Sequence, residues 1–183
     1  MNIFFLDQDP AVAASYHCNQ HLSKMILESA QQLSTAYHAL DLPTIHVPDL
    51  YRPAYQGHPC TQWTCHSVHN MRWLIELCRH LESERMSIGM NPHSSMCVVE
   101  QIDDVLTYDF PQASSQCISE PALAMPAWIK YKTSMSPIEK YKQYYQWKHK
   151  QWHLTKGVGM SYAGRTVPEF MAGPLLFPTA QIG

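Results

Sequence analysis

The sequence lacks any long apolar run, any excess of positive charge and any basic leader segment. No stretch approaches the roughly 18 consecutive apolar residues of a membrane-spanning helix, so we expect no membrane insertion. A formal net charge of −2 excludes a nucleic-acid binder that works by bulk attraction to phosphate. Residues 1–6 are short and are followed at once by Asp7 and Asp9, unlike a secretory signal. We therefore expect a cytoplasmic protein whose six cysteines are free thiols.

Length and apolar content predict one compact domain. The chain has 183 residues, of which 45% are hydrophobic, enough to bury a core. The predicted fold class is mainly α: a single compact helical domain with one short N-terminal strand or extended segment and an irregular C-terminal tail. The domain is expected over residues 1–156, and the Gly- and Pro-rich tail over residues 157–183. The oligomeric state is left open.

Four stretches have helical periodicity. Residues 11–40 contain no Gly or Pro and predict one long helix, or two helices broken near Asn19. Residues 60–86 are likewise free of Gly and Pro and predict a second long helix. Residues 98–106 predict a shorter one, and Pro137–Lys156 begins with a proline at the first turn of a further helix.

The first predicted helix carries ionisable residues at spacings of four, three and four. These are His17, His21, Lys24 and Glu28, which fall along one side of a helix. An imidazole, an amine and a carboxylate within reach of one another are what general acid–base chemistry requires. The alternative is a solvated helix face. We take Glu28, His21 and Lys24 as candidate catalytic residues.

The loop before the second helix offers a candidate anion-binding site. Arg52 and His58 lie on a Pro- and Gly-stiffened segment that leads into a helix N-terminus, where free backbone donors point outward. The alternative is that the loop packs onto the core, to which Arg and His would add little.

A zinc site is a weaker hypothesis. The possible ligands are His17, His21, Cys60, Cys65 and His66. They supply enough nitrogen and sulfur for a tetrahedral ion, but their spacing matches no strict zinc motif. We expect no cofactor, with zinc as the alternative.

Positive charge is concentrated late in the chain. Residues 1–129 carry a net charge of −8, residues 130–156 a net charge of +6, and residues 157–183 none. Aromatic rings interleave with these lysines, a composition typical of surfaces that stack on bases and neutralise phosphates. The candidate binding residues here are Lys142, Tyr144, Tyr145 and Trp147. The alternative is a helix with an aromatic core face and a solvated lysine face.

Five segments resemble a widespread family of small tailed-phage proteins. They are MNIFFLDQDPAVAA at the start, HCNQHLSKMILESAQQLSTA from His17, HPCTQW from His58, AMPAW from Ala124 and KYKQYY from Lys140. The resemblance spans most of residues 1–150. It implies a viral origin and the host-cell cytoplasm, and it assigns no activity.

A second, remote resemblance is to the T-even phage pyrimidine-dimer DNA glycosylase/abasic lyase family. That family has a Gln-His-Leu segment with a catalytic glutamate seven residues after the histidine, and an aromatic-basic stretch near its C-terminus. Here His21 is followed seven residues on by Glu28, and residues 141–145 are similar to the late stretch. Residues 1–6 and the pair His58-Pro59 are similar to segments of its bacterial relatives.

This resemblance implies base excision through a flipped nucleotide. Glu28 would stabilise the oxocarbenium-like sugar and His21 would contact DNA or the sugar. The family uses an N-terminal amine to attack C1′. Here the second residue is the bulky Asn2 and the arginine before the glutamate is Leu27, so the amine is that of Met1 or Lys24, or the lyase step is absent.

Three hypotheses follow from the sequence. The leading one is a phage-encoded DNA glycosylase that acts on the N-glycosidic bond of a damaged or modified base, with DNA as partner. The second is a non-enzymatic phage protein that binds a nucleotide or a host factor. The third is a zinc-dependent hydrolase.

Overall fold

The computed structural model describes residues 2–109, 118–157 and 159–172. Over these residues it is helical, and the extended N-terminal segment contains no strand. The helices are α1 (Pro10–Tyr16), α2 (Asn19–Ala39), α3 (Pro59–His66), α4 (Val68–Ser87), α5 (Met96–Asp109), α6 (Ala127–Lys130), α7 (Pro137–Lys156) and α8 (Glu169–Ala172), with a 3₁₀ turn at Thr44–His46. The predicted mainly α class is confirmed.

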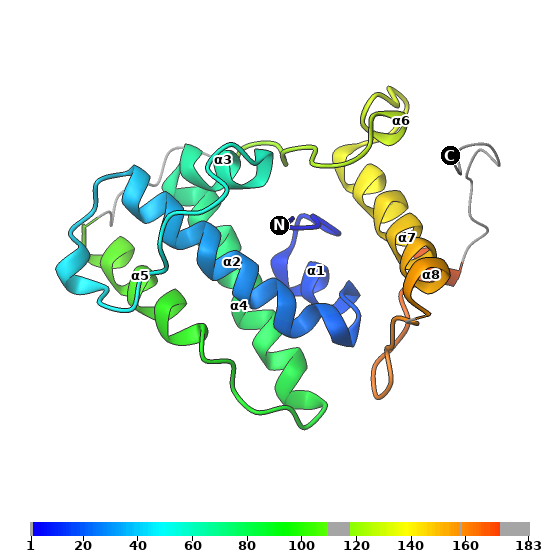
Figure 1. Ribbon diagram of the computed structural model, residues 1–183, viewed down its shortest axis with the longest axis horizontal. Helices are drawn as coiled ribbons and strands as arrows, with labels where there is room; N and C mark the ends of the chain where they lie inside the picture. The colour runs from blue at the N-terminus through cyan, green and yellow to red at the C-terminus, as the bar shows by residue number, and fades with distance from the viewer. Residues whose placement is uncertain (1, 110–117, 158, 173–183) are drawn as a thin grey trace.

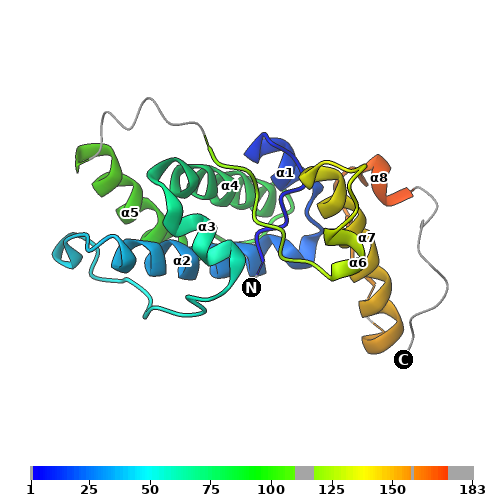
Figure 2. The ribbon, with the colours of Figure 1, turned by 90° about the horizontal axis from the view of Figure 1, so that it is seen from above.

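The N-terminal segment, residues 2–7, lies between the larger group of helices and α7 (Figures 1 and 2). Its residues up to Leu6 are almost completely buried. On one side it meets α2, α3 and α4, and on the other α7. The segment expected to be a strand or an extended lead-in is therefore a buried extended segment that packs between α7 and the helices α2, α3 and α4.

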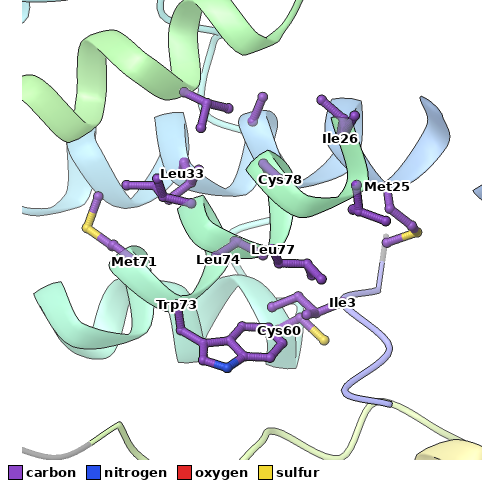
Figure 3. Packing of buried hydrophobic residues seen from close by; sticks show 14 of the residues in the cluster. Ile3, Met25, Ile26, Leu33, Cys60, Met71, Trp73, Leu74, Leu77 and Cys78 are labelled. Atoms are coloured by element: carbon purple, nitrogen blue, oxygen red, sulfur yellow. The ribbon is translucent and has the colours of Figure 1, made fainter. Parts of the chain in front are cut away.

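The core of the larger group forms where α2 and α4 pack together. Leu33 and Ile26 of α2 face Leu74 and Cys78 of α4, and Ile3 of the N-terminal segment packs at their edge (Figure 3). All five side chains are fully buried. Burying an aliphatic side chain of this kind contributes about 1.5–3 kcal/mol.

The first predicted helix is broken into α1 and α2, which is one of the two alternatives that we expected. Asp9 caps α1 by accepting from the backbone N–H of Ala11 at 2.8 Å. The backbone is then extended at His17 and Cys18, and α2 begins at Asn19. The break exposes amide groups that need partners: the Cys18 N–H donates to the Tyr145 hydroxyl at 2.9 Å, and the Asn19 N–H to the Ser161 carbonyl at 2.8 Å.

The prediction of a single helix over residues 60–86 is wrong. The segment forms two helices, α3 and α4, which are separated at Ser67, where the backbone is extended with φ −158° and ψ 155°. The Ser67 hydroxyl accepts from the Asn70 N–H at 3.2 Å and so caps α4. A serine in mid-helix competes for backbone groups, and here it starts a new helix.

Helix α7 has the predicted bounds and strong end signals. Ser136 and Glu139 form a capping box at its start, and Gly157 ends it in the left-handed conformation with φ 64°. Of the residues expected to form a tail, 159–172 are irregular apart from α8. The Asn19–Ser161 bond and the Arg165 guanidinium attach them to α1 and α2. The division into a domain of 1–156 and a tail stays a prediction.

Among the residues described, none of the helices is both long enough and apolar enough to cross a membrane.

Candidate functional site

A pocket of about 400 Å³ lies between the N-terminal segment, α2 and α7. Its lining residues come from six parts of the chain: Asn2, Phe4, His21, Lys24, Glu28, His58, Pro59, Leu123, Ala124, Met125, Lys130, Tyr144, Lys148 and Trp152. Five of these, namely His21, Lys24, Glu28, His58 and Tyr144, are candidates from the sequence. The pocket therefore gathers residues from both the helix-borne and the loop-borne hypotheses.

Glu28 is the one carboxylate among the described lining residues. Its Oε2 accepts a hydrogen bond from the backbone N–H of Asn2 at 3.0 Å, and its Oε1 lies 3.8 Å from Nζ of Lys24. The Glu28 side chain is 17% exposed, against 50% for Lys24. The carboxylate is thus held against the N-terminal segment while it still faces the pocket. Met1 lies outside the described residues.

His21 is fixed by aromatic and polar contacts. Its Nδ1 is 2.7 Å from the Tyr145 hydroxyl, and its ring stacks on Phe4 with a centroid distance of 5.3 Å. The Trp152 ring meets it edge to face, with a centroid distance of 5.1 Å. Burial lowers the pKa of His21 well below its usual value, and the nearby charges of His17 and Lys24 lower it further. The imidazole is therefore neutral at pH 7.

Two lysines of the pocket share one indole ring. Nζ of Lys24 lies 5.1 Å and Nζ of Lys148 5.9 Å from the Trp152 ring centroid. Lys148 also lies 6.0 Å from the Tyr144 ring. Burial, reinforced by the charge of Lys24, lowers the pKa of Lys148. An amine in such surroundings is a better nucleophile near neutral pH than an exposed lysine.

His58 reaches the pocket from the start of α3. Its Nδ1 accepts from the backbone N–H of Cys60 at 3.2 Å and so caps that helix. Burial lowers its pKa, and the charge of Glu28 acts in the opposite direction. The His58 side chain therefore caps α3 through Nδ1 and also lines the pocket.

Phe4 lines the pocket and has a strained backbone conformation. Its φ of 52° lies in the left-handed region, which a bulky side chain rarely adopts. The ring stacks on His21 and on Tyr144, and meets Tyr145 edge to face. These aromatic contacts offset the cost of the unfavourable φ and keep the ring between α2 and α7.

Four predicted binding residues lie elsewhere. Arg52 is exposed and outside the pocket lining. Lys142 lies 3.9 Å from Asp7 Oδ2 and over the rings of Tyr16 and Phe170. The pocket built by α7 therefore does not use every basic residue of that helix.

The other two predicted binding residues outside the pocket lining are aromatic. Tyr145 is completely buried, so its ring has no face for a base to stack on. Trp147 stacks on Tyr144 and meets Trp128 edge to face. Tyr145 thus has the core role weighed as the alternative for this helix, whereas Trp147 is half-buried and packs against Tyr144 of the pocket lining.

The five possible zinc ligands do not meet. Nδ1 of His17 bonds to the Ala13 carbonyl at 2.7 Å, and Cys60 Sγ lies near Asn2 and Tyr141. Cys65 and His66 line a different pocket, with Thr35 and Gln62. Among the described residues no group of three or more His, Cys, Asp or Glu is arranged to hold a metal ion.

Several lining residues escaped prediction from the sequence. Asn2, Phe4 and residues 123–125 come together with α2 only through long-range packing, for which a single sequence gives no signal. Tyr144, Lys148 and Trp152 are different, because their spacing of four places them along one face of α7. The same spacing predicts that Lys142 and Tyr145 lie on other faces of α7.

A second pocket, of about 520 Å³, lies at the opposite side of the N-terminal segment. Phe5, Trp73 and Ile138 give it apolar walls, and its charged lining residues are Asp7 and Glu120. Among its described lining residues there is no Lys, Arg or His. Its charge is the reverse of what a phosphate-bearing ligand requires.

Comparisons with protein-family models, with curated proteins and with solved structures gave no match to this chain.

Proposed function

We propose that the pocket between α2 and α7 is the active site of a DNA N-glycosylase that acts on a damaged or modified base. The observation that carries the proposal is the position of Glu28. It is a single carboxylate beside amines and two histidines, in a pocket lined by Phe4, Tyr144 and Trp152. Its volume of about 400 Å³ lies within the usual range of roughly 300–1,000 Å³ for ligand pockets.

The charge of the pocket supports a nucleotide as the ligand. Lys24, Lys130 and Lys148 surround one carboxylate, so the pocket is positive although the whole chain has a net charge of −2. Phosphate contacts from such lysines would be salt-dependent and confined to a small footprint. The rings beside them suit an extruded base or sugar.

In the proposed reaction an amine attacks C1′ of the deoxyribose while the bond from C1′ to the base breaks. Glu28 stabilises the positive charge that develops on the sugar. It then accepts one proton released by the amine and passes it to O4′ as the ring opens, while the second amine proton is taken up by the departing base. The product is an imine between the enzyme and the sugar, which borohydride reduces to a stable adduct.

The amine has three possible sources. The family resemblance implies an N-terminal amine, and the Asn2 N–H bond to Glu28 brings this segment to the carboxylate. That source requires a mature chain that begins at residue 1 or 2. Lys24 is the alternative from the sequence, and Lys148 joins it because it lines the same pocket with a lowered pKa.

The test is incubation of the purified protein with duplexes that carry ultraviolet photoproducts or an abasic site, with and without borohydride. We expect base release or strand cleavage, and a trapped adduct whose mass-mapped peptide identifies the amine. Glu28→Gln should reduce the rate by at least about 100-fold. Glu169→Gln, which changes an exposed carboxylate on α8, is the matched control. No base release, cleavage or adduct on any duplex would overturn the proposal.

A nucleotide-binding protein without catalysis is the second candidate. The two lysines over Trp152 favour it, because this arrangement binds a phosphate and an aromatic base without further chemistry. Equilibrium binding to a panel of nucleotides, with recovery of the ligand unchanged, separates this function from the first. The same pocket would then serve a phage protein in the host-cell cytoplasm that sequesters a nucleotide or occupies a host factor.

A further inference from the structure

Lys148 is a half-buried lysine on the face of α7 that lines the pocket with Glu28. Its Nζ lies 6.0 Å from the centroid of the Tyr144 ring and 5.9 Å from that of Trp152. Among the described residues it forms no hydrogen bond and no ion pair. Lysines that lose exposure are usually paired with a carboxylate, because a desolvated ammonium group is costly. A half-buried amine whose neighbours are rings is therefore a candidate for chemistry.

The other two lysines of the pocket are placed differently. Nζ of Lys24 lies 3.8 Å from Oε1 of Glu28, and the Lys24 side chain is 50% exposed. Nζ of Lys130 lies 5.9 Å from the ring of Tyr131, which is 74% exposed and outside the pocket lining. An ammonium group held in an ion pair has no lone pair with which to attack carbon. Lys148 is thus the pocket lysine that is neither ion-paired nor placed beside an exposed ring.

The surroundings of Lys148 increase the neutral fraction of its amine. Burial lowers its pKa, and the charges of Lys24 and, more weakly, Lys156 lower it further. The carboxylate of Glu28 acts in the opposite direction, as do the two ring faces. The other titratable lining residues are His21, His58, Lys130 and Tyr144. A desolvated lysine beside a second cation is the usual arrangement for a lysine that forms imines.

We propose that Lys148 is the amine with which this pocket attacks the aldehyde carbon of a phosphorylated sugar, and that Lys24 is a positioning residue that acts on it as a fixed neighbouring charge. In DNA this carbon is C1′ of an abasic site in its ring-opened form. The DNA substrate rests on the proposed function, whereas the reactivity of the amine toward an aldehyde does not. Of the three amines considered above, the role is assigned to Lys148.

The step needs no group beyond the amine, the aldehyde and water. Nζ of Lys148 forms a bond to the aldehyde carbon, and the carbonyl oxygen becomes a hydroxyl group by taking one proton from the amine. This hydroxyl group leaves as water with the second amine proton, and the C=N bond of the imine forms. When borohydride is added, a hydride is transferred to the carbon and water supplies a proton to the nitrogen, which gives a stable secondary amine.

The amine is tested first without DNA. The protein is incubated with 2-deoxyribose 5-phosphate and cyanoborohydride between pH 6 and pH 10, and the labelled lysines are quantified by peptide mass spectrometry. At pH 7 we expect Lys148 to be labelled about tenfold faster than Lys150, an exposed lysine on the same helix. Equal labelling of the two lysines would overturn the proposal.

Lys24→Met tests the positioning role. Loss of the neighbouring positive charge raises the pKa of Lys148, so the midpoint of its labelling profile should move to higher pH and its rate at pH 7 should fall about fivefold. Lys24→Arg keeps the charge and should restore the midpoint of the natural protein. A midpoint that is the same in Lys24→Met and Lys24→Arg would show that Lys24 does not act through Lys148.

An abasic-site duplex with borohydride then connects the assignment to the proposed function. We expect one adduct, mapped to the peptide that contains Lys148, and its loss in Lys148→Arg, which keeps the charge but forms no imine. Lys150→Arg is the matched control, and chemical denaturation checks that both variants are folded. An adduct at Lys24 or at the N-terminal amine would overturn the assignment and leave the proposed function standing. Labelling of Lys148 by the sugar phosphate with no action on any duplex would overturn the proposed function and leave the assignment in place.

Discussion

The two adjacent phenylalanines of the N-terminal segment face different environments. Phe5 packs against Trp63, Trp73 and Tyr141, with ring centroids 4.7–5.5 Å away. Phe4 packs against His21, Tyr144 and Tyr145 at similar distances of 5.1–5.7 Å. Both are almost completely buried. The Phe5 side is aromatic core beside a pocket whose charged lining residues are acidic, whereas the Phe4 side contains histidines and the pocket with Glu28 and three lysines. We infer that the first side supplies stability and the second supplies chemistry.

The largest expected effect tests this division on the Phe5 side. Phe5→Ala leaves a cavity among three large rings and should reduce the free energy of unfolding by about 3–5 kcal/mol. Urea denaturation measures the reduction. At temperatures where the variant is folded, its activity on an abasic duplex should equal that of the natural protein. A folded but inactive Phe5→Ala would remove the distinction between the two sides.

Phe4→Ala is the matched variant on the other side. It also removes a buried ring, and alanine keeps the Cβ atom that makes the backbone φ of 52° unfavourable, so this strain remains. The loss of stability should therefore be similar to that of Phe5→Ala, about 3–5 kcal/mol. Activity should fall in the folded protein, since His21 loses the ring on which it stacks. A folded Phe4→Ala that retains full activity would contradict this.

The next effect is a dependence of stability on pH that arises on the Phe4 side. Burial, with a smaller effect from the charge of Arg165, lowers the pKa of His17 from 6.5 to about 4. The unfolded chain then binds more protons than the folded one below pH 6.5, so stability is full above that pH and falls as the pH drops toward 4. The loss amounts to about 3 kcal/mol.

Urea denaturation between pH 4 and pH 7.5 measures this contribution. His17→Leu should flatten the profile by about that amount, because no buried imidazole remains to be protonated at this position. His46→Gln, which changes an exposed histidine, is the control and should leave the profile unchanged. A profile that is the same in all three proteins would mean that His17 is accessible to protons in the folded state.

A smaller effect is expected on DNA binding, which should depend on the lysines that line the pocket and not on those outside it. Lys148→Met should weaken binding of a short duplex with an abasic-site analogue about tenfold. The slope of log affinity against log salt should fall by about 0.9 for each phosphate that Lys148 neutralises in the natural protein. Lys150→Met, an exposed change on the same helix, should alter neither. Equal weakening by both variants would indicate a general electrostatic surface and no defined pocket.

The sequence predicted helices well because their signals are local. Asp9-Pro10 and Ser136-Pro137 start helices through short-range bonds, and the bounds of α7 were predicted correctly from its opening proline and from Gly157. Ser67 was missed because its effect depends on whether the hydroxyl caps a new helix or faces solvent. Helix content follows from periodicity, whereas a break within an apolar periodic stretch depends on tertiary packing.

The candidate site was predicted in part for the same reason. His21, Lys24 and Glu28 follow from helical spacing, and the structure gathers them in one pocket. The contact of Asn2 with Glu28 spans 26 residues, and Phe4 packs against Tyr144, which is far from it in the sequence. Such pairings depend on how α7 docks. The aromatic rings of α7 were therefore assigned to binding as a group, although Tyr145 is completely buried.

The smallest effect concerns Lys142, the basic residue of α7 on the side away from the pocket. Its ion pair with Asp7 spans 3.9 Å between side chains that are 27% and 31% exposed, which is worth at most about 1 kcal/mol. Its position over the rings of Tyr16 and Phe170 adds a similar small amount. Lys142→Met should therefore reduce the free energy of unfolding by about 1 kcal/mol and leave duplex binding unchanged. If Lys142→Met instead weakened binding as much as Lys148→Met, both faces of α7 would contact the ligand. The site would then extend beyond the Phe4 side.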